Sequence, residues 1–177
     1  MVNKRIAQRY AKAIFDLAIE QQVLENIKDD MAYLSSLSKV KEFYTMLVSP
    51  VIPLHKKQAV CEEILNKNVH KMAAAFVTLI IRKKRSYALP AIAEEFVELY
   101  NNYKKILPVK IYTAIPMDKK IREQIIEKIK KQTSSNQVTL NEDVDEALIG
   151  GFVLRYKDKL YDASIRRQLS ELRKELV

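Results

Sequence analysis

The sequence predicts a mainly α-helical protein, with an N-terminal six-helix bundle over residues 1–105 and a small α+β domain over residues 106–177. Three observations lead to this fold class. Two glycines and five prolines among 177 residues are few, which favours helix. Apolar residues recur at helical spacing as far as Lys105. After Ile106 the repeat changes to the alternation typical of strands, which also predicts a hinge between the two domains.

The first helix is predicted over residues 3–20. Its small and apolar residues fall on one face, which comprises Ala7, Ala11, Ile14 and Ala18. Tyr10 and Leu17 widen the apolar surface beyond a single stripe. Such a helix either lies deep in a bundle or binds a partner, and the small residues allow another helix to approach closely.

Five further segments complete the predicted bundle, namely residues 23–38, 40–48, 54–65, 72–81 and 90–105. Proline residues separate the second and third of these segments, and Pro90 stands at the start of the last. The segment 72–81 is apolar nearly all round, as expected of a helix at the centre of a bundle. Its large apolar residues include Phe76, Leu79 and Ile80.

A basic cluster, Arg82–Arg85, follows that central segment. Cations at a helix C-terminus are favourable because they face the negative end of the helix dipole. The alternative interpretation is contact with phosphate or RNA. No aromatic residues interleave with these cations, so the sequence favours the helix-end interpretation.

The second domain is predicted in the order β-α-β-β-β-α. Its elements are a strand at 107–114, a helix at 117–132, strands at 138–140, 152–156 and 160–161, and a helix from Ser164 to the end. In the first strand Val109, Ile111 and Thr113 face the same way.

Both glycines of the chain stand together at Gly150 and Gly151, before the strand at 152–156. A glycine pair allows backbone angles or a close approach that a Cβ atom would block. Phosphate binding by a glycine-rich loop is the alternative. It is disfavoured, because the run has neither dinucleotide-binding nor P-loop spacing and no helix follows it directly.

The last helix carries a narrow apolar stripe at spacings of four, three and four, made of Ile165, Leu169, Leu172 and Leu176. Asp162 or Ser164 can cap its start with a side-chain oxygen. The stripe suits docking against one neighbouring helix, and it equally suits packing on the protein's own sheet. The sequence leaves both possibilities open.

Composition and residue spacing argue against several function classes. The net charge of +9 suits an acidic partner, nucleic acid or an anionic membrane surface, but the cations are spread along the chain without an RNA-binding motif. His55, His70 and Cys61 lack metal-ligand spacing, and no nucleophile motif is present. We therefore expect no metal, no cofactor and no enzymatic activity.

The remaining polar features have ordinary interpretations. The acidic run 142–146 lacks the pattern of a calcium loop and is interpreted as a solvated turn. Cys61 cannot form an internal disulfide and is expected to be a buried, inert thiol. The sequence has no apolar run of membrane-spanning length and no signal or transit segment, which favours a bacterial cytoplasmic protein.

Three stretches of the chain resemble the ATP synthase delta subunit family, which includes the mitochondrial oligomycin-sensitivity-conferring protein. The most specific is the run DEALIGGFVLRYKDKLYDASIRRQLSEL. The others are the first-helix motif RYAKAIF and the landmark in which Arg85 precedes Leu89-Pro90. The residues that carry the motif are Arg85, Gly150, Gly151, Arg155, Asp162, Ser164 and Arg166. Lys84 and Ala163 stand where family members more often have glycine.

The resemblance implies a non-catalytic peripheral-stalk, or stator, subunit that links the catalytic head of F-type ATP synthase to the b-subunit stalk. Proton-driven rotation would thereby be coupled to ATP synthesis. The N-terminal bundle would hold the N-terminal helices of the alpha subunits in a groove between its first helix and segment 72–81. Candidate groove residues are Ala7, Tyr10, Ala11, Ile14, Ala18, Phe76, Leu79 and Ile80.

The same resemblance implies that the C-terminal domain holds the b subunit, with Ile165, Leu169, Leu172 and Leu176 as candidate contacts. The protein would be peripheral, at the cytoplasmic face of the bacterial membrane, and would not bind nucleic acid. Two alternatives are a basic helical nucleic-acid-binding module and a helical scaffold unrelated to rotary enzymes.

Overall fold

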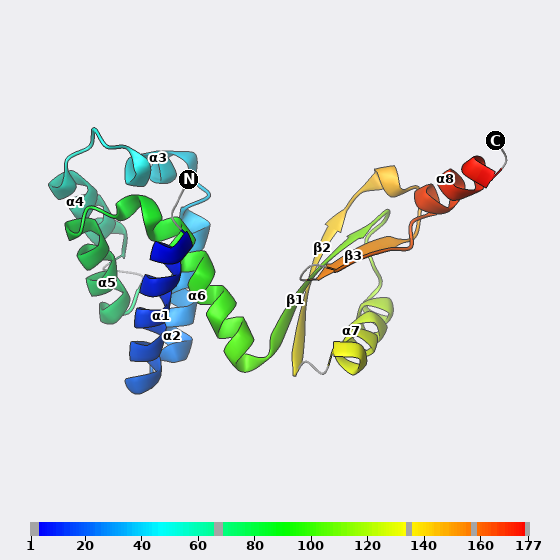
Figure 1. The fold of residues 1–177 in the computed structure, drawn as a ribbon, viewed down its shortest axis with the longest axis horizontal. Helices are drawn as coiled ribbons and strands as arrows, with labels where there is room; N and C mark the ends of the chain where they lie inside the picture. Colours follow the sequence, from blue (N-terminus) through cyan, green and yellow to red (C-terminus); the bar gives the residue numbers. More distant parts are fainter. Residues whose placement is uncertain (1–3, 66–68, 134–135, 157–158, 176–177) are drawn as a thin grey trace. The chain divides into compact units, whose positions relative to one another are not determined.

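A computed structural model gives the fold of the protein as mainly helical, with a small C-terminal four-stranded sheet (Figure 1). It describes residues 4–65, 69–133, 136–156 and 159–175. By its internal contacts the chain divides into two compact units, Met1–Tyr100 and Asn101–Val177. The division falls inside the last helix of the first unit, a little before the boundary predicted after Lys105.

The first unit is built from helices joined by short connections. They are α1 (Lys4–Glu20), α2 (Leu24–Leu37), α3 (Lys41–Val48), α4 (Leu54–Leu65), α5 (Lys71–Arg82), the 3-10 turn η1 (Ser86–Ala88) and α6 (Leu89–Lys104). The predicted helical segments agree closely with these bounds, because each carries an apolar face at the helical repeat. The periodicity did not reveal η1, which is too short to show one.

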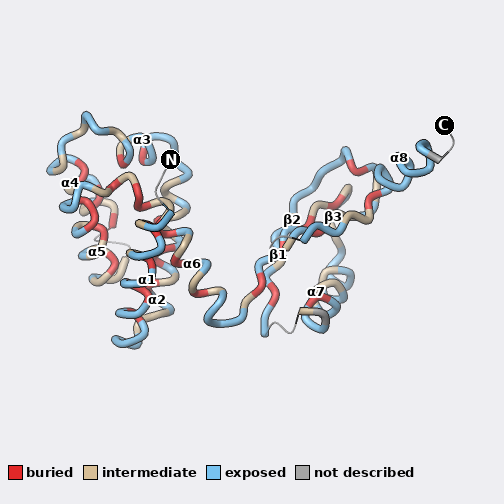
Figure 2. The backbone as a smooth tube through the Cα atoms, viewed as in Figure 1, coloured by how far each residue is buried: buried red, intermediate tan, exposed pale blue. Residues whose placement is uncertain are grey.

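The core of this unit lies where α1, α2, α5 and α6 meet, and Figure 2 shows its buried backbone in red. Phe96 is fully buried, and its ring meets the edge of the Phe15 ring at 5.6 Å between centroids. Ala7, Ala11 and Ala18 are also fully buried, and their small side chains allow neighbouring helices to pack close to α1.

A buried lysine holds the end of α3. The Nζ atom of Lys57 lies 2.8 Å from the Leu47 carbonyl oxygen, 2.7 Å from that of Ser49 and 3.1 Å from Ser86 Oγ. Each of its three donors therefore has a partner, which offsets the cost of burying the charge. Burial nevertheless lowers the pKa of Lys57.

The end of α5 has a backbone geometry that is unusual for lysine. Lys84 has a φ of 59°, and its N–H donates to Ile81 O at 2.8 Å. The next N–H, of Arg85, donates to Ile80 O at 3.0 Å. These two bonds satisfy carbonyls at the helix end in the arrangement that normally places glycine in the left-handed position.

Replacement of Lys84 by glycine should therefore stabilise the protein, by about 0.5–1 kcal/mol, because glycine adopts positive φ without a Cβ clash. Urea unfolding of the full chain would measure the change. Lys83→Gly is the matched control, because Lys83 has a φ of −75° and should gain nothing from glycine. Equal effects of the two substitutions would contradict this account of the helix end.

The second unit follows the predicted order. Its elements are β1 (Ile106–Thr113), α7 (Lys119–Thr133), β2 (Gln137–Val144), the 3-10 turn η2 (Glu146–Leu148), β3 (Phe152–Tyr156), β4 (Lys159–Asp162) and α8 (Ile165–Glu175). The sheet order is β2-β1-β3-β4, with β1 parallel to β2 and antiparallel to β3, and with β3 antiparallel to β4.

One face of this sheet forms the core of the unit. Leu107, Val109, Ile111 and Thr113 alternate as buried residues along β1, which confirms the predicted facing of that strand. Ile129 of α7 packs against this face, and Val138 of β2 and Leu154 of β3 belong to the same core. A single strand at the centre of the sheet therefore supplies much of the core.

The interpretation of run 142–146 as a solvated turn is wrong for Glu142 and Asp143, which lie in β2. This strand is longer than predicted because it pairs with β1 as far as Val144. Glu142 accepts a hydrogen bond from Met117 N at 2.7 Å and forms an ion pair with Arg122. The Arg122 contact lowers the pKa of Glu142 and fixes α7 to the sheet.

Candidate partner-binding surfaces

The structure divides the eight candidate groove residues of the first unit between core and surface. Five of them are buried in the unit's own core, namely Ala7, Ala11, Ile14, Ala18 and Ile80. Tyr10 and Phe76 are partly exposed, and Leu79 leaves 46% of its surface open. The inner face of α1 thus packs within the unit, and the residues available to a partner lie at its margin.

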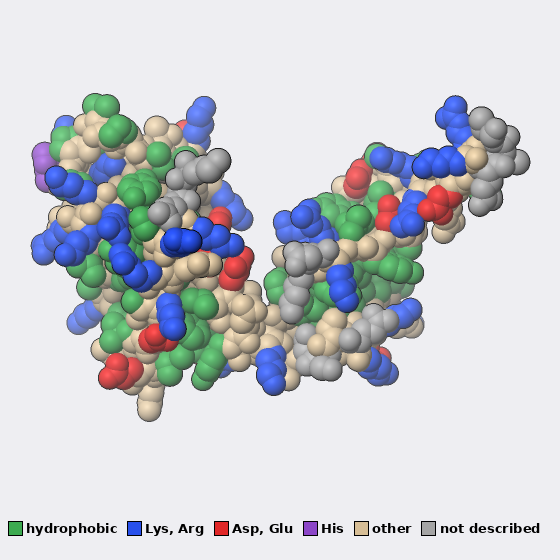
Figure 3. Space-filling view, viewed as in Figure 1, with side chains coloured by type: hydrophobic (Ala, Val, Ile, Leu, Met, Phe, Trp, Pro, Cys, Tyr) green, Lys and Arg blue, Asp and Glu red, His purple; other side chains and the backbone are tan. Residues whose placement is uncertain are grey.

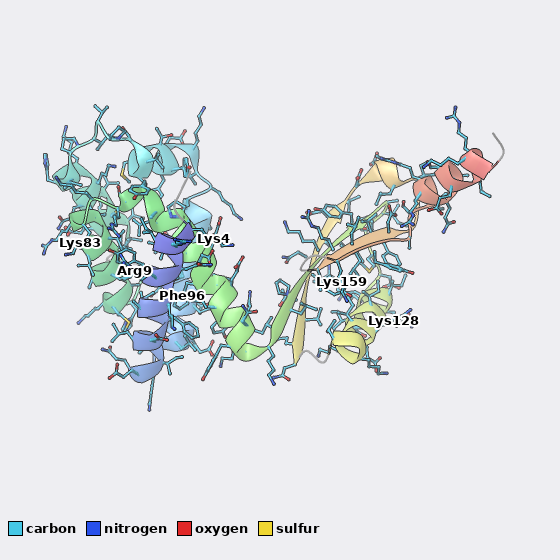
Figure 4. The ribbon with its side chains drawn as sticks, in the orientation of Figure 1. Lys4, Arg9, Lys83, Phe96, Lys128 and Lys159 are labelled. Atoms are coloured by element: carbon cyan, nitrogen blue, oxygen red, sulfur yellow. The ribbon has the colours of Figure 1, made fainter. Side chains whose placement is uncertain are left out.

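We call Tyr10, Leu17, Phe76 and Leu79 the α1–α5 surface. Leu17 is exposed and follows Tyr10 by two helical turns, so the two lie on one side of α1. It was not among the candidate groove residues, although the helical repeat could have found it. Figure 3 shows basic side chains on the side of the first unit that faces the viewer, and Figure 4 labels Arg9 and Lys83.

Arg85 connects the end of α5 to α1. Its guanidinium lies 5.6 Å from the centroid of the Tyr10 ring, and its Nη1 donates to Tyr10 Oη at 3.4 Å. Arg9 approaches the same ring, also at 5.6 Å. Arg85 therefore has an internal contact, which gives this motif residue a structural role.

Both predicted capping residues act at the start of α8. The Oγ atom of buried Ser164 accepts a hydrogen bond from Arg167 N at 3.2 Å and so caps the helix. Asp162 Oδ1 in turn accepts from Ser164 N at 2.9 Å. Hydrogen bonds from the Ser164 side chain and backbone lower the pKa of Asp162.

The glycine pair allows the chain before β3 to approach the start of α8. Gly151 has a φ of 76°, and a Cβ atom there would lie 2.2 Å from Ala163 O. At Gly150 the three atoms nearest to a Cβ atom would all belong to the Ile165 side chain. Ile165 N donates to Gly150 O at 3.0 Å across the same junction. The structural interpretation of the pair is confirmed.

The apolar stripe of α8 is left open by its own unit. Ile165, Leu169 and Leu172 expose 41%, 52% and 54% of their surface, and Leu176 lies outside the described residues. Figure 1 shows α8 running beyond the end of the sheet. Packing of Leu169 and Leu172 on the protein's own sheet, one of the two predicted possibilities, is therefore not what the structure shows.

The other motif residues of this unit serve the sheet and the surface. Arg155 lies in β3, paired in register with Lys110 of β1 and Leu160 of β4. Arg166 is exposed on α8 and lines a polar depression together with Asp145 and Asp162. Neither arginine belongs to the apolar stripe.

The described part of the chain contains no group of three or more His, Cys, Asp or Glu side chains that could hold a metal ion. Nor does it contain a helix long and apolar enough to cross a membrane. Cys61 is buried, as expected, and burial raises the pKa of its thiol to about 11.

Comparison with known proteins gives one consistent result. A family model described as the ATP synthase delta (OSCP) subunit matches residues 6–176. The ATP synthase subunit delta of Christiangramia forsetii is 34% identical over 177 residues, covering 99% of this chain and 95% of the relative. The chain belongs to the ATP synthase delta (OSCP) subunit family.

Further delta subunits agree with this assignment. That of Flavobacterium johnsoniae is 33% identical, covering 99% of both chains. A chain of the Toxoplasma gondii mitochondrial ATP synthase hexamer has the same fold, with a TM-score of 0.74, 21% identity and 96% of both chains covered. A delta subunit is a non-catalytic component of the peripheral stalk of F-type ATP synthase. The assignment thus favours a stalk subunit over the alternative nucleic-acid-binding module.

The two glycines of the chain should respond differently to alanine. Gly151→Ala should cost about 2 kcal/mol or more of folding free energy, because the added Cβ meets a backbone carbonyl at positive φ. Gly150→Ala should cost less, because the Ile165 side chain can rotate away. Chemical denaturation of both variants would measure this, and equal costs would contradict the proposed role of Gly151.

Proposed function

We propose that this protein is the stator link of an F-type ATP synthase. Its N-terminal six-helix bundle would hold N-terminal helices of the alpha subunits, and α8 would hold the b subunit of the peripheral stalk. A tether of this kind resists rotation of the catalytic head, so that proton-driven rotation of the rotor is coupled to ATP synthesis. The protein would lie at the cytoplasmic face of the membrane, attached through the complex.

The observation that carries the proposal is the open stripe of α8. Leu169 and Leu172 stand at helical spacing with more than half of their surface exposed, and Ile165, which packs beside Gly150, continues the same stripe. The polar side of α8 is occupied separately, with Arg167 Nε 2.7 Å from Glu171 Oε1. Burial of one leucine-sized side chain contributes roughly 1.5–3 kcal/mol, so a partner helix along this stripe would be held firmly.

The contact with the alpha subunits is assigned to the α1–α5 surface. Its apolar side chains come from two helices that the Arg85–Tyr10 contact ties together. Apolar residues at helical spacing on two helices suit a third helix laid between them. The buried alanines behind this surface would support the contact by keeping α1 close to its neighbours, without touching the partner.

Leu169→Asp in the full chain should weaken binding to the purified b subunit by at least about tenfold, because it places a charge in the apolar stripe. Ser170→Asp adds the same charge to the next residue, on the polar side of α8, and should change affinity little. Titration calorimetry would measure both. Equal affinities of the two variants would exclude α8 as the b-subunit contact.

Leu79→Asp should likewise weaken binding of an alpha-subunit N-terminal peptide to the full chain, again by at least about tenfold. Tyr44→Asp on α3 is the matched control, because Tyr44 exposes 45% of its surface and Leu79 exposes 46%. Fluorescence anisotropy of a labelled peptide would give both affinities. A larger loss of affinity for Tyr44→Asp than for Leu79→Asp would show that the peptide binds elsewhere than on the α1–α5 surface.

A further inference from the structure

The face of the sheet that points away from its core carries two cations at neighbouring positions. Lys110 of β1 is the direct partner of Arg155 of β3 in the antiparallel pair, and both residues are exposed. On its other side Lys110 is in register with Asn141 of β2, which is exposed as well. Strand pairing therefore sets one amide and two cations in a single row across β2, β1 and β3, whose order Figure 1 shows.

The two cations of this row repel each other. The Cβ atoms of directly opposite residues lie about 4.5–5.5 Å apart, and like charges at such positions destabilise a sheet. Within the described part of the chain, no ion pair or side-chain hydrogen bond neutralises either Lys110 or Arg155. The chain itself thus leaves the repulsion in place, and an anion from outside would relieve it.

The carboxylates on the same face stand outside the row. Asp143 lies two residues beyond Asn141 along β2, in register with Tyr112. Asp162 lies at the end of β4, where it accepts a hydrogen bond from Ser164 N at 2.9 Å. Neither carboxylate is a register partner of one of the two cations.

An open depression of about 360 Å³ lies over the row. Its lining residues are Pro108, Lys110, Asn141, Arg155 and Tyr156, and none of these described residues is acidic. An ammonium and a guanidinium group donate hydrogen bonds and accept none, and a side-chain amide can donate as well. The depression therefore presents converging donors and positive charge, which is the chemistry that binds an oxyanion.

We propose that Lys110, Arg155 and Asn141 form a binding site for a phosphate-type dianion. The planar guanidinium of Arg155 would bind a pair of phosphate oxygens, the Lys110 ammonium would bind another, and the Asn141 amide would add a neutral donor. A dianion between the cations replaces their repulsion with attraction, so phosphate is favoured over a singly charged ion such as chloride. The site goes beyond the proposed stator function, since none of its residues belongs to α8 or to the α1–α5 surface.

Nuclear magnetic resonance of the isotope-labelled full chain would test the site. Sodium phosphate is added while sodium chloride keeps the ionic strength constant. Saturable shifts are expected for the Asn141 side-chain amide and for the backbone amides of Lys110 and Arg155. Lys110→Gln and Arg155→Gln should each weaken phosphate binding by at least about tenfold, because each removes a charge-assisted hydrogen bond. Lys159→Gln is the matched control and should change nothing, since exposed Lys159, labelled in Figure 4, lies on the opposite face of the sheet.

Three results would overturn the proposal. Shifts that do not saturate, or that spread over other basic surfaces, would mean an adventitious ion only. Equal losses of affinity for Lys159→Gln and Lys110→Gln would mean a response to overall charge. A polyglutamate peptide that binds the row more tightly than phosphate would assign the surface to an acidic protein segment instead. Circular dichroism would check the fold of each variant, and the location of the shifts in the unchanged chain decides the matter even if one variant fails to fold.

The same phosphate chemistry occurs in the free anion and in the headgroup of phosphatidic acid, and a second measurement distinguishes these sources. The full chain is sedimented with phosphatidylcholine vesicles that contain phosphatidic acid. Sedimentation that is lost in Arg155→Gln and kept in Lys159→Gln would assign the site to a lipid headgroup. Phosphate binding without sedimentation would assign it to the free anion.

Discussion

The close approach of two backbone segments in the second unit determines how that unit presents its surfaces. Gly151 lies against the Ala163 carbonyl, and bonds from Ala163 N to Phe152 O and from Ile165 N to Gly150 O join the same segments. This junction fixes where β4 ends and where α8 begins. The caps by Ser164 and Asp162 then start the helix at that point. The open stripe of α8 follows from this arrangement.

The first unit is held by a different kind of constraint, in which polar side chains satisfy the ends of helices. Lys57 closes the end of α3, and Asp30 accepts a hydrogen bond from His70 N at the start of α5, at 2.9 Å. Burial raises the pKa of Asp30. These contacts fix the short connections between helices, while the alanines of α1 allow close packing. The apolar residues that remain at the surface are thereby held on a rigid support.

Much of the fold could be predicted, because its helices and its central strand carry clear periodicities. The helical repeat predicted which face of α1 is apolar, but it could not say that Ala7 and Ile14 pack within the unit while Leu79 stays open. Burial within the unit and exposure at the surface both agree with the same helical spacing of apolar residues. The length of β2 and the contacts of Glu142 were missed because they depend on parallel pairing with β1. The apolar groove that Ile125 and Ile129 of α7 form with Tyr161 of β4 is likewise a property of sheet order, which local sequence does not encode.

The buried cysteine has a practical consequence. Cys61 is the chain's one cysteine, and its thiol stays protonated at neutral pH because its pKa lies near 11. Maleimide reagents require the thiolate, so they should spare this residue in the folded protein. Cysteines introduced at exposed positions of the two units could then carry a fluorophore pair with the native thiol left in place. Single-molecule energy transfer would then report the distance between the two labelled positions.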